Sequence, residues 1–274
     1  MKVVKYSGDV VNFEESKLRR SLLKSGASEN QVDNVLGQIV SQLYDGISTK
    51  KIYALAFELL KSESNAKAAR YNLRAALELL GPAGFYFEKY ISFLFREDGY
   101  QTKINLNLSG KCVSHEVDLV VQKNNEIKMV ECKFHANRDI ISDVKIPMYI
   151  LSRFNDLKSV THAIFSSEDE ITSCLIVTNN RFSDDAIQFA MCSGIELVSW
   201  DFPKENTLRN KIDKSHLYPI TCLTTLTLEE KKGLLEQEII VVRQLNGNSE
   251  SLALIGISQE RMKTIQKEVS ELCN

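Results

Sequence analysis

Hydrophobic and polar residues alternate through the middle of the chain. Ile104, Leu106 and Leu108 alternate with polar residues, which predicts a strand with one exposed face. Two runs rich in Val, Leu, Ile and Met then flank Asn124-Asn125. Asn tolerates positive φ, so residues 115–135 are predicted to form a β-hairpin with a two-residue turn. Later runs predict a buried strand, a helix and another strand at residues 175–178, 184–192 and 195–199.

The two ends of the chain are predicted to be mostly helical. Short strands at the N-terminus precede apolar residues at helical spacing, and the last of these helices, residues 65–80, is stopped by Gly81-Pro82. A polar stretch with one short helix separates the middle from a second set of helices. We therefore expect an α/β core, a mixed sheet flanked by helices, between two helical parts. The expected domains are residues 1–80, 81–205 and 216–274.

The predicted hairpin places four charged residues together. If Asn124-Asn125 form the loop, the numbers of opposite residues sum to 249, so Asp118 faces Glu131 and Glu116 faces Lys133. Side chains alternate along a strand, which puts these four on one face. The other face carries the residues that suit a core, namely Val117, Leu119, Val121, Val130 and Cys132. Opposed carboxylates repel each other, and a divalent cation would relieve that repulsion.

These residue types suit phosphodiester chemistry. Carboxylates hold Mg²⁺ through oxygen, and the metal polarises a phosphate and lowers the pKa of a bound water. Lys133 could orient that water or offset charge on the phosphorus oxygens. Glu88, on a predicted helix at residues 84–96, could supply a third carboxylate or turn to solvent. The pattern Asp-x₁₂-Glu-x-Lys also occurs on ordinary exposed hairpins, but its setting between two helices favours the catalytic interpretation.

Residues 81–200 resemble the PD-(D/E)xK nuclease superfamily, and in particular its Mrr-like restriction endonucleases. The likeness rests on Asp118, Glu131-x-Lys133 and the Phe87-Glu88 pair. It implies a Mg²⁺-dependent endonuclease acting on DNA, with catalytic Glu88, Asp118, Glu131 and Lys133, and with the three carboxylates as metal ligands. Val117 stands where the superfamily has Pro. Lys145 stands where many relatives have Gln in a Gln-x₃-Tyr motif, although Tyr149 is in place.

A predicted helix after the hairpin carries Lys145, Tyr149 and Arg153 one turn apart. This face could contact DNA phosphates, or it could simply be solvated. His115 and His135 flank the acidic face of the hairpin. Each could be a structural residue, a ligand or a catalytic group, because histidine serves in all three roles.

The first eighty residues resemble the ATP-cone, a nucleotide-binding regulatory domain. The match rests on Val-x-Lys-x-x-Gly, Phe-x₃-Lys-Leu-x-x-Ser-Leu, Leu-Tyr-Asp-Gly-Ile-Ser-Thr and Ala-Ala-Arg-Tyr. The resemblance implies that Lys5 and Lys17 contact the phosphates of ATP or dATP, that Gly8 permits a tight hairpin turn, and that Val3 and Thr49 line the nucleotide site. Tyr6 replaces the Arg that usually follows the first Lys. Without the resemblance, this part would be a helical interaction domain with solvated lysines.

The tail has a weaker likeness. Ile255-Gly256-Ile257-Ser258, between two predicted helices, resembles the second hairpin of a tandem helix-hairpin-helix module, whose backbone amides bind DNA phosphates. The corresponding first hairpin, Thr225-Leu226-Thr227, lacks glycine, and the segment is acidic. The tail is therefore either a DNA-binding module or a small docking domain.

Composition restricts the setting. No apolar run approaches the ~20 residues that span a membrane, and the first residues lack a signal-peptide core, so we expect a cytoplasmic protein. Six cysteines without a Cys-x-x-Cys pair argue against a zinc ribbon. With a net charge of −2, DNA contact must rely on local basic patches or a partner. The expected function is a homo-oligomeric endodeoxyribonuclease under ATP or dATP control. The alternatives are a nucleotide-sensing DNA-binding regulator without cleavage, or a nuclease for RNA or branched DNA.

Overall fold

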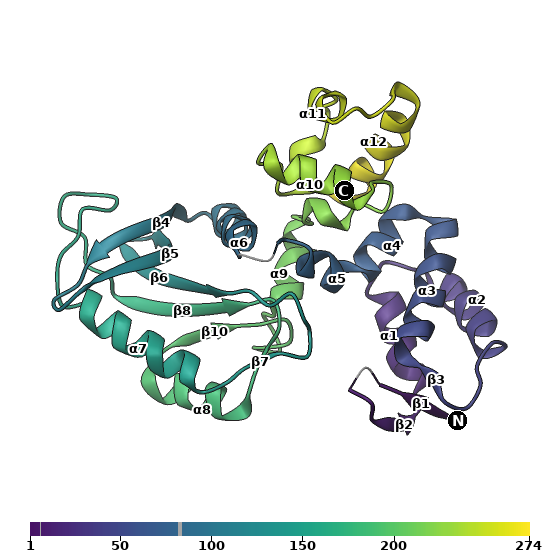
Figure 1. Cartoon of the computed structure of the whole chain (residues 1–274), viewed down its shortest axis with the longest axis horizontal. Helices are drawn as coiled ribbons and strands as arrows, with labels where there is room; N and C mark the ends of the chain where they lie inside the picture. Colours follow the sequence, from purple (N-terminus) through teal and green to yellow (C-terminus); the bar gives the residue numbers. More distant parts are fainter. Residues whose placement is uncertain (6, 82–83) are drawn as a thin grey trace. The chain divides into compact units, whose positions relative to one another are not determined.

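The computed structural model describes residues 1–5, 7–81 and 84–274. These residues form two compact units, drawn in Figure 1. One unit joins Met1–Ala76 with Tyr218–Asn274, and the other is Leu77–Leu217. The C-terminal tail therefore belongs to the same unit as the N-terminal region. None of the helices in the described residues is long and apolar enough to cross a membrane.

The unit Leu77–Leu217 is built on a mixed five-stranded sheet with the order β10-β8-β6-β5-β4. Strands β4, β5 and β6 are antiparallel, whereas β8 lies parallel to both β6 and β10. The strands are β4 (Gln101–Ser109), β5 (Ser114–Lys123), β6 (Glu126–Lys133), β8 (Ser173–Thr178) and β10 (Glu196–Val198). The predicted α/β core with a mixed sheet is confirmed.

Helices cover both faces of this sheet. In Figure 1, α7 and α8 lie along one face and α6 lies over the other. The helices and the small parallel pair beside them are α6 (Phe85–Glu97), α7 (Lys145–Leu157), α8 (Asp184–Ser193), α9 (Leu208–Ser215), β7 (Ile141–Ser142) and β9 (Arg181–Phe182). Buried Val120, Met129, Ile150, Ile176 and Ala186 belong to one core cluster under α7 and α8. As predicted, Gly194 ends α8 with a positive φ of 72°.

The β5–β6 hairpin forms with the predicted turn. Asn124 and Asn125 have φ of 50° and 62°, which a two-residue hairpin turn with positive φ at both positions requires. Lys123 pairs with Glu126 and Leu119 with Val130, so the sum of 249 is confirmed over this range. The ladder between the two strands ends at Leu119↔Val130, one residue short of Asp118.

The predicted strict alternation of side chains is wrong near Asp118. Val117 packs in one core cluster with Val120, although alternation over three residues would put them on opposite faces. The reason lies partly in β4, where Asn105 has a positive φ of 52° and the β4–β5 register omits Asn105 and Asp118. Such a local irregularity re-aims a side chain at the edge of regular pairing. Asp118 therefore lies where both of its neighbouring ladders are interrupted.

The N-terminal region combines a small sheet with helices. The elements are β1 (Lys2–Val4), β2 (Val10–Asn12), α1 (Glu15–Leu23), α2 (Glu29–Val40), β3 (Ile47–Ser48) and α3 (Thr49–Glu63). The strand β3, which the sequence pattern did not predict, pairs in parallel with β1. Ser48 caps α3 by accepting a hydrogen bond from the backbone of Lys51.

The single helix predicted over residues 65–80 is instead two helices, α4 (Asn65–Tyr71) and α5 (Leu73–Glu78). The hydroxyl of Tyr53 donates to the Tyr71 carbonyl at 3.1 Å and lies 2.8 Å from Asn72 Oδ1, so side-chain contacts gather where the helix is interrupted. Gly81 follows with φ of 101°. Pro82, in the predicted stop signal, and Tyr6, in the predicted nucleotide motif, lie outside the described residues.

The tail is helical, as predicted, and packs on the N-terminal region. Its elements are η1 (Ile220–Cys222), α10 (Leu228–Glu236), η2 (Val242–Leu245), α11 (Glu250–Leu254) and α12 (Gln259–Cys273). Thr221 Oγ1 donates to the Ala76 carbonyl at 2.6 Å. Buried Glu268 accepts hydrogen bonds from the backbone and hydroxyl groups of Thr224 and Thr225. Gly256, with φ of 80°, lies between α11 and α12.

Candidate functional site

Asp118 is held at the irregular point of β5. Its Oδ2 accepts a hydrogen bond from the Cys132 backbone N–H at 2.7 Å. Burial, and then the negative charge of Glu131, raise the pKa of Asp118 to about 6. The hydrogen bond from Cys132 and the nearby cations only partly oppose this rise. The backbone of β6 therefore fixes the Asp118 carboxylate, and Glu131 lies close enough for its charge to affect the pKa of Asp118.

Glu131 is a buried carboxylate held by two cations. Its side chain is 3% exposed, and Oε1 accepts a hydrogen bond from Lys133 Nζ at 2.6 Å. Oε2 accepts from Arg153 Nη1 at 2.8 Å. A buried charge is stable only when it is paired in this way. The predicted proximity of Lys133 to Glu131 is thus present as a direct ion pair.

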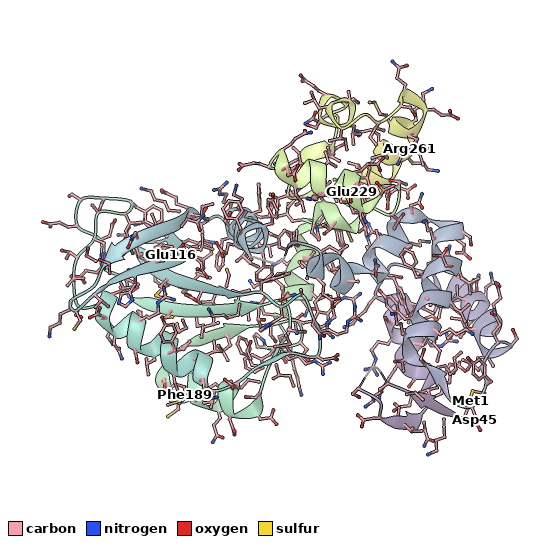
Figure 2. The ribbon with its side chains drawn as sticks, in the orientation of Figure 1. Met1, Asp45, Glu116, Phe189, Glu229 and Arg261 are labelled. Carbon is pink, nitrogen blue, oxygen red and sulfur yellow. The ribbon has the colours of Figure 1, made fainter. Side chains whose placement is uncertain are left out.

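Glu88, on α6, lies next to the same cluster. Burial raises the pKa of Glu88 to about 7, together with the negative charges of Asp118, Glu116 and Glu131. The positive charge of Lys133 partly opposes this rise. Figure 2 labels Glu116, on β5. The structure therefore brings the four residues predicted to be catalytic close enough for their charges to interact, from three different elements.

The donor set suits a hard divalent cation. Among the described residues, no three His, Cys, Asp or Glu side chains are arranged to coordinate a metal as they stand. Both oxygens of Glu131 are instead bound by cationic side chains. However, burial and then the neighbouring carboxylates raise the pKa of Glu88 and of Asp118, and a cation beside them would favour their charged forms. The available ligands are carboxylate oxygens, which favour Mg²⁺. The Cys132 thiol is not counted among these ligands, because burial raises its pKa well above its usual range.

The prediction that Lys145, Tyr149 and Arg153 form a phosphate-contacting face of α7 is wrong for Arg153. Lys145 and Tyr149 are exposed, but Arg153 is buried and bonded to Glu131. Arg153 lies three residues after Ile150 and four before Leu157, both of which are in the core. This spacing already placed Arg153 on the apolar side of the helix, and it is the sequence signal that the prediction missed.

Both histidines make structural contacts. His115 Nε2 lies 2.8 Å from Asp156 Oδ2, and Asp156 also accepts from the backbone N–H of Cys112 and of Val113. These contacts tie the β4–β5 connection to α7. His135 Nε2 lies 3.0 Å from Ser142 Oγ, and burial and then the charge of Lys133 lower the pKa of His135.

Four of the five predicted nucleotide-binding residues, all except Gly8, line a cavity of about 280 Å³ in the N-terminal region. Its lining is Val3, Lys5, Val11, Asn12, Phe13, Glu14, Lys17, Leu18, Thr49 and Ile52. The cavity thus has an apolar side and two lysines. Lys17 Nζ lies 2.7 Å from Glu14 Oε1, and both side chains are largely exposed. Gly8, with φ of 89°, forms the β1–β2 turn and is not in the lining.

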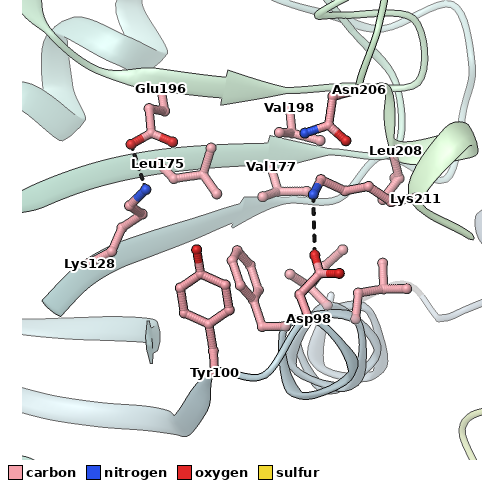
Figure 3. A pocket seen from close by; sticks show the side chains of 13 residues that line it. Asp98, Tyr100, Lys128, Leu175, Val177, Glu196, Val198, Asn206, Leu208 and Lys211 are labelled. Carbon is pink, nitrogen blue, oxygen red and sulfur yellow. Dashed lines mark hydrogen bonds and ion pairs between the residues drawn. The ribbon is translucent and has the colours of Figure 1, made fainter. Parts of the chain in front are cut away.

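Another cavity, of about 170 Å³, lies between the sheet and helices α6 and α9 (Figure 3). Its polar groups are largely paired with one another: Lys128 Nζ lies 2.5 Å from Glu196 Oε1, and Lys211 Nζ lies 3.4 Å from Asp98 Oδ2. Lys128 and Glu131 are three residues apart on β6, so they point to opposite faces of the sheet. This cavity therefore contains none of the candidate catalytic residues.

Comparisons with known proteins match three segments of the chain. Family models described as ATP cone domain, as restriction endonuclease and as AF1548-like, C-terminal, match residues 1–75, 82–201 and 218–273. An uncharacterized protein of Archaeoglobus fulgidus is 31% identical over 180 residues, covering 65% of this chain and 97% of its own length. The crystal structure of AF1548, a protein of unknown function, aligns with a TM-score of 0.56 and 29% identity, covering 69% of this chain and 97% of that one. The chain therefore belongs to the AF1548-like family, and it carries an N-terminal ATP-cone domain and a restriction-endonuclease-like domain.

Proposed function

We propose that this protein is a Mg²⁺-dependent endonuclease that hydrolyses phosphodiester bonds of DNA. One observation carries the proposal: Glu88, Asp118, Glu131 and Lys133 interact at the point where the β5–β6 ladder ends. If these residues were only an ordinary surface feature of the hairpin, their side chains would be exposed and each carboxylate would be paired with a cation. Here the carboxylates are partly or fully buried, and burial and then neighbouring carboxylates raise the pKa of Glu88 and of Asp118.

Each of these residues has a distinct task in the proposed site. Glu88, Asp118 and Glu131 would hold the metal, which polarises the scissile phosphate and supplies a more acidic bound water. Lys133 would place its ammonium beside the phosphorus oxygens, where negative charge grows in the transition state. The backbone N–H of Cys132 keeps Asp118 oriented through its hydrogen bond. Lys145 and Tyr149, exposed on α7, are proposed DNA contacts.

Plasmid nicking with Mg²⁺ tests this proposal. Wild-type protein should convert supercoiled DNA to nicked or linear forms, on either methylated or unmethylated plasmid, and Asp118→Ala should not. RNA and branched DNA are run beside the plasmid as alternative substrates. Absence of cleavage of every substrate, together with retained DNA binding, would favour a DNA-binding regulator instead.

We further propose that the N-terminal cavity binds ATP or dATP as an effector. Val3 and its apolar neighbours would face the base or sugar, while Lys5 and Lys17 would contact phosphates. Thr49, also in the lining, offers a hydroxyl as a hydrogen-bond donor or acceptor. The cavity is open to solvent at its lysines, which suits a ligand that enters and leaves as nucleotide levels change.

Regulation requires that nucleotide binding and DNA binding be coupled. Such coupling is typically about 1–3 kcal/mol, which corresponds to roughly 5–150-fold in affinity, and it is reciprocal. Light scattering with and without ATP or dATP, and a titration with both ligands, measure oligomeric mass and coupling. A flexible Gly-Ser insertion between Leu80 and Gly81 should leave both ligands bound but weaken their coupling. A nucleotide that binds without changing mass or DNA affinity would leave the cavity without a regulatory role.

A further inference from the structure

Arg153 lies in the apolar row of α7. Ile150, Phe154 and Leu157 around it belong to the core cluster, and Arg153 itself is 9% exposed. Charged side chains are rarely buried to this extent unless they are paired. The groups that Arg153 touches therefore indicate its role more directly than its position on a basic helix face.

The guanidinium joins the two strands of the hairpin. Nη1 donates to Glu131 Oε2 on β6 at 2.8 Å, and Nη2 donates to the backbone carbonyl of Glu116 on β5. Backbone pairing between β5 and β6 has ended at Leu119↔Val130, so Arg153 bridges the strands beyond their last paired residues. A planar guanidinium fixes two acceptors in one geometry, which an ammonium does not do.

We propose that Arg153 is a positioning residue of the nuclease site and not a contact to DNA. By binding Oε2 of Glu131 it fixes the orientation of the carboxylate, whose Oε1 accepts a hydrogen bond from Lys133 and keeps a second lone pair for a cation. Through the Glu116 carbonyl it also fixes the segment that carries Asp118 two residues later. This inference rests on the proposed function, because it assigns Arg153 to the same metal site.

Removing the guanidinium should weaken metal binding. Loss of a residue that orients a metal ligand typically lowers metal affinity or activity by about 10–100-fold. We expect Arg153→Met, which keeps an unbranched side chain, to lower the Mg²⁺ affinity of the full chain about tenfold or more in calorimetry without DNA. Lys158→Met, an exposed lysine at the C-terminal end of the same helix, is the matched control and should leave that affinity unchanged.

DNA binding gives the second readout. A duplex probe in EDTA is bound without cleavage, and the slope of log affinity against log salt reports phosphate contacts. Loss of one phosphate contact lowers that slope by about 1. Because Arg153 is buried, Arg153→Met should keep the wild-type slope. A slope lower by about 1 together with unchanged Mg²⁺ affinity would show that Arg153 contacts DNA, and the inference would be wrong.

Asp118→Ala separates the inference from the function on which it rests. If Asp118→Ala binds Mg²⁺ as wild type does, the proposed metal site is wrong. If Asp118→Ala loses Mg²⁺ but Arg153→Met stays within about twofold of wild type, only the role of Arg153 is wrong. Should Arg153→Met fail to fold, Arg153→Lys replaces it, because one ammonium cannot hold both acceptors. An affinity of Arg153→Lys within about twofold of wild type would overturn the inference, and a larger loss would support it.

Discussion

Two carboxylate–lysine pairs lie at the two candidate sites, and they differ chiefly in burial. Glu131 and Lys133 are 3% and 29% exposed, with Arg153 as a second partner, whereas Glu14 and Lys17 are 52% and 71% exposed. Exposed ion pairs contribute about 0–1 kcal/mol because solvent screens them. Breaking a buried pair costs about 3–5 kcal/mol, since one charge is left without a partner. Burial therefore decides how strongly each pair is fixed.

This difference suits the two proposed roles. A catalytic cluster must be held in position before substrate arrives, so that little reorganisation remains during the reaction. An effector site that reports nucleotide concentration needs no such rigidity, and Lys17 can exchange Glu14 for a phosphate at small cost. We therefore expect substitutions in the buried pair to have large effects on cleavage, and substitutions in the exposed pair to have moderate effects on nucleotide affinity.

The largest effect is expected from Lys133→Ala. Loss of a preorganised donor at the reacting phosphate should lower the cleavage rate by at least about 10²–10³-fold. Mg²⁺ affinity should be largely kept, because Lys133 is not a proposed ligand, and single-turnover cleavage with calorimetry separates the two quantities. Lys128→Ala removes a lysine from the same strand but from the other face, and should cleave at the wild-type rate. Wild-type cleavage by purified Lys133→Ala would show that the assigned site is wrong.

A smaller effect is expected from Lys5→Ala/Lys17→Ala. Charge-assisted hydrogen bonds to phosphate contribute about 1.5–3 kcal/mol each, and exposure reduces this value. ATP affinity measured by calorimetry should fall at least about tenfold, the factor that 1.4 kcal/mol produces. Lys24→Ala, at the end of α1 and outside the cavity lining, is the control. Unchanged ATP affinity in the double variant would remove these lysines from the site.

Glu88 offers a test through pH. Its pKa is raised from 4.5 to about 7, so the folded protein binds this proton more tightly than the unfolded chain does. Stability without metal should therefore fall as pH rises from 4.5 to 7, and Glu88→Gln should remove that loss. Because Glu88 is only half-buried, we expect a gain of about 1–2 kcal/mol for Glu88→Gln at pH 8, and none near pH 4.5.

Denaturant unfolding of the full chain in EDTA, at pH 4.5 and pH 8, measures this gain. Mg²⁺ should reverse it, because the metal stabilises wild type through the carboxylate that the variant lacks. Glu97→Gln, at the exposed end of α6, is the control and should show no such pH dependence. Equal stability of wild type and Glu88→Gln at pH 8 would mean that burial and the neighbouring carboxylates do not raise the pKa of Glu88.

Local patterns in the sequence predicted the hairpin but not its distortion. Asn124-Asn125 set the turn and the register, because both residues tolerate positive φ. The same rule could not show that Asn105 on the neighbouring strand also has positive φ, which breaks the alternation around Asp118. That conformation depends on pairing with residues distant in the sequence. Alternation alone therefore assigned Val117 to the wrong face.

Long-range contacts explain the other differences. The pairing of β3 with β1 joins Ile47 to Val3, and such a two-residue strand has no pattern of its own. Arg153 was predicted to be a DNA contact because lysine and arginine at helical spacing suggest a basic face. The apolar residues Ile150 and Leu157 already indicated that Arg153 is buried, but its pairing with Glu131 depends on which part of the sheet α7 covers. The residues of the candidate site were thus identifiable from a motif, whereas the group that holds Glu131 was not.

The smallest expected effect is a rise in ATP affinity, opposite in sign to the fall expected when Lys5 and Lys17 are replaced. Glu14→Gln removes the carboxylate that Lys17 contacts at 2.7 Å, so the ammonium becomes available to a phosphate without first leaving a partner. Because an exposed ion pair is worth about 0.2–1 kcal/mol, ATP affinity should rise by about 1.4–5-fold in calorimetry. Added salt should shrink this gain, since it screens exposed charges. Glu15→Gln, one residue further and outside the cavity lining, should change affinity less. A loss of ATP affinity in Glu14→Gln would mean that Glu14 itself contacts the nucleotide, and the exposed pair could then no longer be treated as a simple competitor of phosphate.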